Sequence, residues 1–304
     1  MKKPITIGLI DIRLFLPFLL AAFLIANGYI GEYVPTANYS YYISGMGTSF
    51  GFMLARLIPY VLRYPTDLSP KKNCNKNNFK DYGLFFIFYG IYRGTVLVVH
   101  FTEFNTSRIS ALCTNQSVEI ISFLVITTLF LKYKYYIHNI ISLISFCVFS
   151  VIIDLISGNL LKIQSIDLLY SIVIITEDFF YCYMKYMIDN KYHKYWDIIF
   201  FQGVFYFIFM SIAIIIRIKI EGDASFIAGY FSEDQIGPVS AIFFFNVFMG
   251  GLVQQVLNVL IIYLFSPNHM LIAYVINKIK KILADKTRTD YYHLFCIIPF
   301  VFQI

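Results

Sequence analysis

The sequence predicts an all-α integral membrane protein with about ten transmembrane helices. Hydrophobic residues make up 59% of the 304 residues and charged residues only 14%, whereas soluble domains typically carry about 25% charged residues. Several apolar runs reach the roughly 20 residues that a helix needs to cross about 30 Å of hydrocarbon. These runs are continuous, which excludes the short alternating segments of a membrane barrel. We therefore expect the lipid bilayer to surround most of the chain.

The apolar segments place the predicted helices in order along the chain. We expect spans at residues 8–29, 39–62, 82–101, 109–131, 137–157, 166–188, 195–216, 238–264, 267–284 and 291–304. Because ten spans with short connections use up the length, we expect a single membrane domain, residues 1–304, and no separate soluble domain. An uncleaved first helix is favoured over a secretory signal, since no small-residue cleavage pattern follows before Glu32. The tenth segment has only 14 residues, so the last helix is expected to be truncated.

Lysine and arginine residues predict the orientation of the spans. If the amino terminus is cytoplasmic, eleven basic residues fall on that side and four on the opposite side, counted through the seventh connection. Cytoplasmic loops carry such an excess, so we predict a cytoplasmic amino terminus, in a membrane that the sequence does not identify. The ninth connection should face the far side, yet it is strongly basic from Lys278 to Arg288. Either the ninth segment lies on the cytoplasmic face as an amphipathic helix, or tertiary packing overrides the charge rule there.

Two similar stretches suggest that the chain contains an internal repeat. The basic aromatic turn Lys132–His138 follows a span and precedes an apolar run, and Lys286–His293 does the same in the second half. Two halves of five spans, residues 1–160 and 161–304, must have opposite orientations because five is an odd number. Many secondary transporters use such an inverted repeat to alternate access to a central site.

In this layout the chain resembles the drug/metabolite transporter superfamily, which includes nucleotide-sugar and triose-phosphate carriers. The resemblance lies in the ten short-looped helices, in the basic turn Phe130–Tyr135, and in Lys191–Lys194 leading into Phe200–Gly203. The short tenth span and the basic ninth connection depart from that pattern. The resemblance covers nearly the whole chain and implies transport without naming a cargo, because members of one fold carry very different solutes.

Ionisable side chains at membrane depth are the first candidates for a site, since they cost about 2.5–3.5 kcal/mol at a helix centre unless they face a cavity or a partner. Arg93 and His100 are seven residues apart and share one helical face. The planar guanidinium of Arg93 could bind phosphate or carboxylate. An ion pair between Arg93 and a carboxylate on a neighbouring span is the equally weighted alternative.

Carboxylates in two further spans could couple transport to protons, because desolvation raises their pKa. Asn115 and Glu119 lie one turn apart in the fourth span, and Glu177 and Asp178 are adjacent in the sixth. The alternative is that these carboxylates pair with Arg93, Arg56 or Lys185 and only hold helices together. Since adjacent residues of a helix point about 100° apart, we expect Glu177 and Asp178 to have different roles.

The eighth span adds amide side chains. Gln254 and Asn258 are four residues apart and could bind a polar solute together with Asn246, or could simply link helices. The patterns Gly47–Gly51 and Gly90–Gly94 are typical of close helix packing. The predicted substrate-binding residues are Arg93, His100, Asn115, Glu119, Glu177, Asn246, Gln254 and Asn258.

Together these features predict a secondary transporter that moves a small polar metabolite, with an anion as one candidate, by alternating access. The alternatives are a non-transporting membrane scaffold or receptor-like protein, and a membrane-embedded enzyme that acts on lipid-linked substrates. No phosphate-binding glycine loop, zinc spacing or nucleophile motif is present in the sequence. We therefore expect no catalytic activity, no cofactor, no metal ion and no nucleic-acid partner, with a small-molecule solute as the ligand and an oligomeric state that the sequence leaves open.

Overall fold

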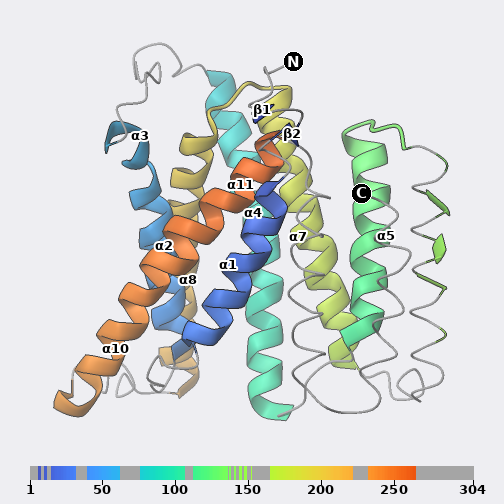
Figure 1. Cartoon of the computed structure of the whole chain (residues 1–304). Coiled ribbons are helices and arrows are strands. Elements are labelled where there is room, and N and C mark those ends of the chain that lie inside the picture. The colour runs from blue at the N-terminus through green and yellow to red at the C-terminus, as the bar shows by residue number, and fades with distance from the viewer. Residues whose placement is uncertain are drawn as a thin grey trace.

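The structure is a computed structural model in which most of the predicted helical segments are described. The described residues are 6–7, 10–11, 15–31, 40–61, 76–106, 112–135, scattered positions from 137 to 152, 165–221 and 232–264. Within these ranges the chain is helical apart from short connections and one small antiparallel pair, β1 (Thr6–Ile7) and β2 (Ile10–Asp11). The prediction of an all-α fold is confirmed for this part of the chain (Figure 1).

Helices occupy the first four predicted spans and the sixth to eighth. They are α1 (Leu16–Gly31), α2 (Ser40–Ala55), α3 (Ile58–Val61), α4 (Lys76–Thr106), α5 (Leu112–Phe130), α7 (Ser165–Asp189), α8 (Tyr195–Glu221), α10 (Glu233–Phe245), η3 (Asn246–Gln254) and α11 (Gln255–Leu264). The last three follow one another without interruption and cross the other helices obliquely (Figure 1). Only scattered residues of the fifth span are described, and the ninth and tenth spans lie outside the described residues. The arrangement as ten helices in two repeats stays a prediction.

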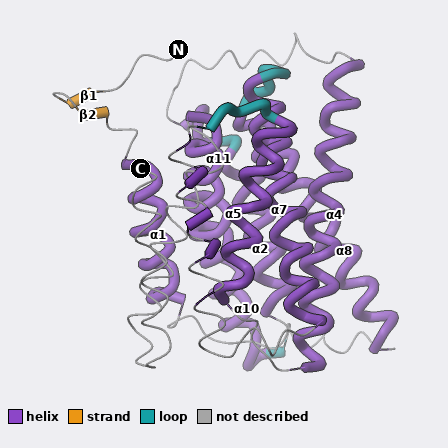
Figure 2. The backbone as a smooth tube through the Cα atoms, turned by 90° about the vertical axis from the view of Figure 1, so that its right-hand side faces the viewer, coloured by secondary structure: helices purple, strands orange, loops and turns teal. Residues whose placement is uncertain are grey.

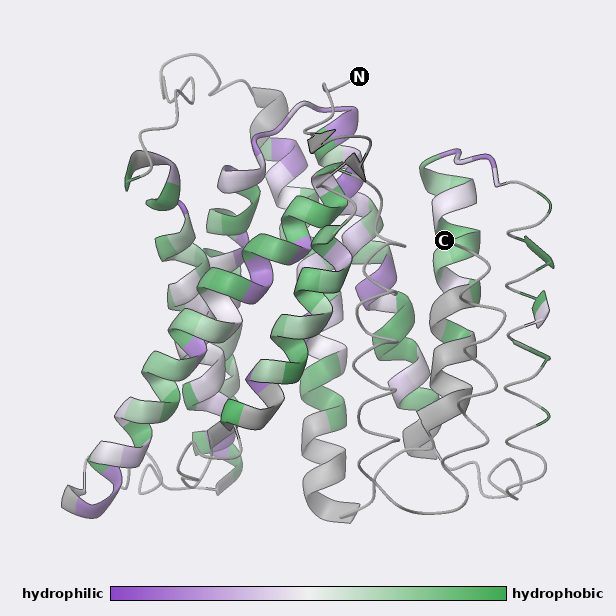
Figure 3. Cartoon of the chain, in the orientation of Figure 1, coloured by the Kyte–Doolittle hydropathy of each residue, from purple (hydrophilic) through white to green (hydrophobic). Residues whose placement is uncertain are grey.

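Several helices are long and apolar enough to cross a membrane. The segments Phe79–Val99, Tyr195–Ile220 and Asp234–Leu264 each combine sufficient length with high hydropathy, and Leu16–Asn27 and Ile121–Phe130 are shorter apolar helices. Hydrophobic residues cover most of these helices, while hydrophilic residues gather in the connection between α7 and α8 (Figure 3). An integral membrane protein is therefore supported, and its orientation stays a prediction.

The two halves of the chain are interleaved. In the described part, α2 packs most extensively against α8 and η3, α4 against α7 and α8, α5 against α7, and α1 against α11. Among the described helices, each extensive contact of a helix from residues 1–160 is thus with a helix from residues 161–304. Figure 2 shows α2, α4, α5, α7 and α8 running roughly parallel or antiparallel to one another.

By their contacts the helices form two groups that meet along a narrow seam. We call α4, α5 and α7 the α4 group, and α1, α2, α8, α10, η3 and α11 the α2 group. Between the groups, the extensive contacts in the described part are α4 with α8 and α7 with α11. The core at this seam is aromatic: Phe85, Tyr89 and Phe180 are completely buried, and Tyr206 is nearly so.

Glycine allows the closest helix approach, between α2 and η3. A Cβ atom added to Gly51 would lie 2.6 Å from the Cα of Gly251, and one added to Gly47 would lie 2.5 Å from the Phe243 carbonyl oxygen. The prediction that Gly47–Gly51 is a packing site is confirmed. In the second pattern, Gly90 would meet the Phe209 ring at 2.6 Å, whereas Gly94 has no described atom within 4 Å of such a Cβ. The second pattern is therefore a packing site at only one of its two glycines.

The turns that end α5 and α7 share one backbone geometry. Lys132 and Tyr192 have φ angles of 55° and 56°, in the left-handed region that glycine favours. In each turn the next residue's backbone N–H donates to a carbonyl six residues earlier, at 3.3 Å after α5 and 3.1 Å after α7. The basic segments Phe130–Tyr135 and Lys191–Lys194 thus share this turn conformation, whereas Lys286–His293, the predicted counterpart of Lys132–His138, lies outside the described residues.

Candidate functional site

Arg93 lies inside α4, well within an apolar segment. It comes fourteen residues after Phe79 and six before Val99, so it lies about 21 Å and about 9 Å from the two ends of that segment along the helix axis. At such a depth a guanidinium needs partners that replace its lost hydration. The side chain is partly buried.

Three tyrosine rings surround the guanidinium group of Arg93. Its central carbon lies 3.7 Å from the ring centre of Tyr206 in α8, 5.3 Å from that of Tyr92 and 5.7 Å from that of Tyr89. Its Nε atom also donates a hydrogen bond of 3.1 Å to the Tyr89 hydroxyl. The faces of aromatic rings attract a cation, more strongly where water is excluded, so the three rings stabilise the Arg93 charge.

The terminal amino groups of Arg93 are not used in this arrangement. Among the described residues, Arg93 forms no ion pair, and its only hydrogen bond is the one from Nε. A guanidinium group has five N–H donors, four of them on its terminal nitrogens. The alternative of a direct Arg93–carboxylate ion pair is therefore not realised in the described part of the chain.

Glu177 in α7 joins the same cluster through Tyr92. Its carboxylate accepts hydrogen bonds from the hydroxyls of Tyr92 and Tyr181 and is near enough to Arg93 for their charges to interact. Tyr92 therefore contacts both the cation and the carboxylate. The structure brings together two predicted site residues, Arg93 and Glu177.

Asp178 turns away from this cluster toward α5. Its carboxylate accepts a hydrogen bond from the Ser122 hydroxyl, and both side chains are buried. Glu177 and Asp178 thus have different partners, as expected of adjacent residues in a helix, and their different roles stay a prediction. The two other basic residues considered as partners are engaged elsewhere: Arg56 pairs with Asp197 at 3.1 Å, and Lys185 pairs with Asp189 at 3.2 Å.

A chain of amides extends the cluster into the α2 group. Tyr89 is hydrogen-bonded to the side chain of Gln202, and the Gln255 Nε2 atom donates to the Gln202 Oε1 atom at 2.5 Å. Both glutamines are only 4% exposed. A continuous polar path thus runs from α11 through α8 and α4 to α7.

Sequence reasoning did not select Tyr89, Tyr206, Gln202 or Gln255 as site residues. Two spacings in the sequence could have indicated these residues. Tyr89 lies four residues before Arg93, and Gln202 lies four residues before Tyr206, so the two members of each pair share a helical face. A polar residue four positions from a tyrosine within an apolar run could have been noted in both spans.

The three predicted site residues of the eighth span, Asn246, Gln254 and Asn258, do not form one cluster with one another. Asn246 accepts a hydrogen bond from Ser44 in α2 at 2.8 Å and donates one to the Ile242 carbonyl at 2.8 Å, so it links α2 to η3. Asn258 in α11 is 2% exposed, and its Oδ1 atom has no hydrogen-bond partner among the described residues. Gln254 is partly buried at the end of η3. Asn246 thus matches the helix-linking alternative.

The side chains of His100, Asn115 and Glu119 lie outside the described residues. Their backbones belong to α4 and α5. Their part in the site stays a prediction. Among the described residues, no group of three or more histidine, cysteine or acidic side chains could hold a metal ion.

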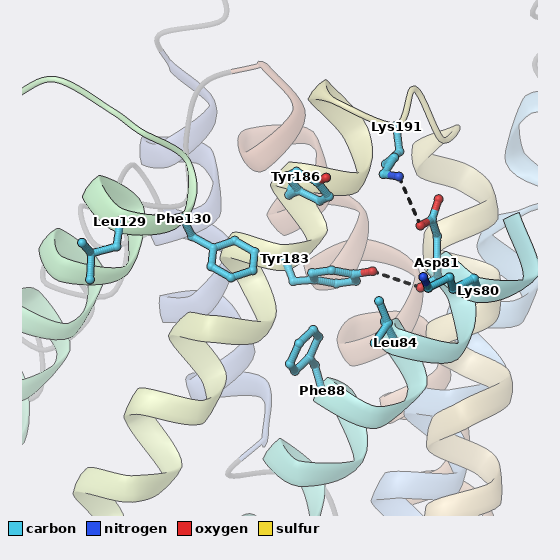
Figure 4. A pocket seen from close by; sticks show the side chains of 9 residues that line it. All are labelled: Lys80, Asp81, Leu84, Phe88, Leu129, Phe130, Tyr183, Tyr186 and Lys191. Atoms are coloured by element: carbon cyan, nitrogen blue, oxygen red, sulfur yellow. Dashed lines mark hydrogen bonds and ion pairs between the residues drawn. The ribbon is translucent and has the colours of Figure 1, made fainter. Parts of the chain in front are cut away.

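A pocket of about 630 Å³ opens near the start of α4, at the ends of α5 and α7. It is lined by Lys80, Asp81, Leu84, Phe88, Leu129, Phe130, Tyr183, Tyr186 and Lys191 (Figure 4). None of the predicted site residues is among them. Asp81 organises its polar side: Lys191 lies 3.5 Å and His193 3.3 Å from its carboxylate, and the Tyr183 hydroxyl donates to its backbone carbonyl at 3.2 Å.

The turn after α5 carries one phenol with a shifted pKa. Burial raises the pKa of Tyr133 to about 12, and the negative charge of Asp189 adds to the shift. The Tyr133 side chain therefore stays neutral at physiological pH, and the charges of this turn come from its lysines.

No model of a known protein family matches the chain, and no curated protein sequence matches it. The resemblance to drug/metabolite transporters therefore stays a prediction from the layout of the sequence.

Proposed function

We propose that this protein is a membrane carrier of a small anionic solute, with Arg93 as the residue that binds the anion. The observation that supports it most is the state of the Arg93 guanidinium, whose charge is deep in an apolar segment while its terminal N–H groups have no described partner. An arginine that served only to join helices would be expected to hold a carboxylate directly. The planar pair of terminal amino groups instead suits a phosphate or carboxylate ligand.

The place of Arg93 on the seam favours transport over simple binding. Arg93 extends from the α4 group, and its nearest ring, Tyr206, belongs to the α2 group. A carrier must open alternately on the two sides of such a site. Because the halves 1–160 and 161–304 are interleaved, the moving bodies we propose are the α4 group and the α2 group.

Glu177 could couple the binding of the solute to the uptake of a proton. The charges of Glu177 and Arg93 are near enough to interact, so an anion bound to Arg93 would bring a second negative charge close to this carboxylate. Uptake of a proton by Glu177 would then offset the repulsion. Proton coupling at Glu177 is therefore part of the proposal.

Uptake into vesicles reconstituted with the purified full-length protein tests the proposal. The probes are radiolabelled inorganic phosphate, a hexose phosphate and a nucleotide sugar, since the solute is not identified. We expect uptake of at least one probe, its loss in Arg93→Gln, and partial retention in Arg93→Lys, which keeps the charge. Arg56→Gln is the matched control, because Arg56 pairs with Asp197 away from the cluster. Wild-type uptake by a folded Arg93→Gln protein would contradict the assignment of Arg93.

A non-transporting scaffold is the second candidate, and the tyrosine rings favour it. Three rings around one guanidinium could serve stability alone. In that case Arg93→Gln would lower thermal stability, and no anionic probe would enter the vesicles.

A further inference from the structure

The pocket at the start of α4 lies at the level of the helix ends. Lys80 and Asp81 follow directly after Phe79, the first residue of one candidate span, and Lys191 follows the end of α7. The end of α5 meets them there, so α4 runs antiparallel to both α5 and α7. In the topology predicted from the basic residues, this end faces the cytoplasm. Charged side chains of the pocket therefore stand where lipid headgroups lie.

The polar side of the pocket carries an excess of positive charge. Lys80 and Lys191 line it, against the single carboxylate of Asp81. That carboxylate is already engaged by Lys191 and His193. Lys80 forms no ion pair with any described residue, so its ammonium group is available to an anion from outside.

The other side of the pocket is apolar and reaches into the depth of the membrane. Leu84 and Phe88 lie four and eight residues after Lys80, which places them about 6 Å and about 12 Å deeper along α4. Leu129 and Phe130 form the opposite wall on α5, and Leu129 is 75% exposed (Figure 4). The pocket therefore has a cationic part at the level of the helix ends and an apolar wall deeper along the helices. This wall is open toward the surrounding hydrocarbon.

This combination of depth, charge and opening matches an amphiphile whose headgroup is an anion. We propose that the pocket binds an anionic phospholipid, with the phosphate held by Lys80 and Lys191 and an acyl chain lying along Leu84, Phe88 and Leu129. Basic pockets between membrane helices on the cytoplasmic side bind anionic headgroups. The volume of about 630 Å³ lies within the range of about 300–1,000 Å³ that is typical of ligand sites. The site is separate from Arg93, and the proposal does not depend on transport.

Native mass spectrometry of the purified full-length protein in an uncharged detergent tests this site. Phosphatidylglycerol and phosphatidylcholine are each titrated into the protein and their affinities are compared. Glycerol 3-phosphate is added in a separate series to test a phosphate group that carries no acyl chains. We expect phosphatidylglycerol to bind at least about fivefold more tightly than phosphatidylcholine. Lys80→Gln should lower the affinity for phosphatidylglycerol about fivefold, which is the effect of one lysine at a membrane surface. Lys134→Gln is the matched control, since this exposed lysine of the turn after α5 does not line the pocket.

A second variant separates the lipid from a soluble phosphate. Leu84→Trp fills the apolar side of the pocket. It should therefore weaken the binding of phosphatidylglycerol and leave any binding of glycerol 3-phosphate unchanged. Equal affinity for the two lipids, or a folded Lys80→Gln protein that binds phosphatidylglycerol as the wild type does, would overturn the proposal. Glycerol 3-phosphate that binds as tightly as the lipid and is lost in Lys80→Gln would also overturn it, because the occupant would then be a soluble phosphate ester.

Discussion

The guanidinium carbon of Arg93 lies 3.7 Å from the centre of the Tyr206 ring, and this contact joins the two helix groups at their seam. At that distance the cation lies directly against the ring face. The contact links α4 to α8, whose packing is one of the two extensive contacts between the groups in the described part. The same pair therefore matters for stability and for the proposed transport.

The ring of Tyr206, rather than its hydroxyl, should stabilise the seam. We expect Tyr206→Leu to lower the free energy of unfolding by about 1–2 kcal/mol, because it removes a desolvated cation–π contact. Tyr206→Phe keeps the ring and should change the stability by less than about 0.5 kcal/mol. Thermal unfolding in detergent measures both. A loss in Tyr206→Phe as large as in Tyr206→Leu would show that the hydroxyl, not the ring, is the stabilising group.

Because Gly51 and Gly251 are in close contact, adding one methyl group at Gly251 should lower the free energy of unfolding substantially. Gly251→Ala would place a Cβ atom 2.4 Å from the Gly51 Cα, and backbone cannot move aside as a flexible side chain can. We expect a loss of about 1–3 kcal/mol, the usual cost of overpacking, measured by thermal unfolding.

Gly94→Ala is the matched control for that substitution. No described atom lies within 4 Å of a Cβ at Gly94, so alanine should be neutral or should stabilise α4 by about 0.5–1 kcal/mol through its higher helix propensity. Equal losses at Gly94 and Gly251 would rule out the α2–η3 contact as the cause.

Composition and hydropathy alone predicted the helical membrane class and the positions of most described helices. They could do so because a span must be apolar along its own length, which is a local property of the sequence. The cost of an ionisable group in lipid likewise selected Arg93 and Glu177, and the structure brings these two together. Both predictions depend on the cost of placing each residue in the bilayer, which the local sequence determines, and not on its packing partners.

The partners could not be predicted, because they come from helices far apart in the sequence. Tyr206 reaches Arg93 only through the packing of α4 on α8, and no local pattern of the sequence selects that pair of helices. The interleaving of the two halves depends on tertiary packing in the same way.

In the eighth span the sequence pointed to Gln254, whereas Gln255 is the residue bonded to Gln202. Gln255 comes directly after the π-helix η3. Its i→i+5 hydrogen bonds insert an extra residue into the turn and shift the side chains that follow it away from α-helical spacing.

Gln202 and Gln255 should stabilise the protein as a pair. The hydrogen bond between them is buried, so either single substitution to leucine leaves one amide without its partner. A double-mutant cycle of Gln202→Leu and Gln255→Leu, followed by thermal unfolding, should give a coupling energy of about 0.6–1.7 kcal/mol. Strictly additive losses would mean that the two amides act independently.

The shared end of α4, α5 and α7 gives a direct test of orientation. Lys134 and Lys191 lie at that end, whereas Lys219 lies at the opposite end of α8. In a variant whose native cysteines are replaced by alanine, Lys134→Cys and Lys191→Cys should react with a membrane-impermeant maleimide only from the cytoplasmic side. Lys219→Cys should react only from the other side. The reverse pattern would invert the predicted topology, and labelling of all three from one side would contradict α8 as a span.

The left-handed residue after α7 predicts a substitution that stabilises the protein. Tyr192 has a φ angle of 56°, which costs an L-residue roughly 1–2 kcal/mol relative to glycine, and its side chain is 84% exposed. Tyr192→Gly should therefore raise the free energy of unfolding by up to about 1 kcal/mol, after the extra flexibility of glycine in the unfolded chain is subtracted. Tyr192→Ala is the control, because it removes the same ring but keeps the Cβ atom that causes the strain. Thermal unfolding of the two variants separates the effects: a gain in both would assign the benefit to removal of the exposed ring, and a gain in Tyr192→Gly alone to the backbone.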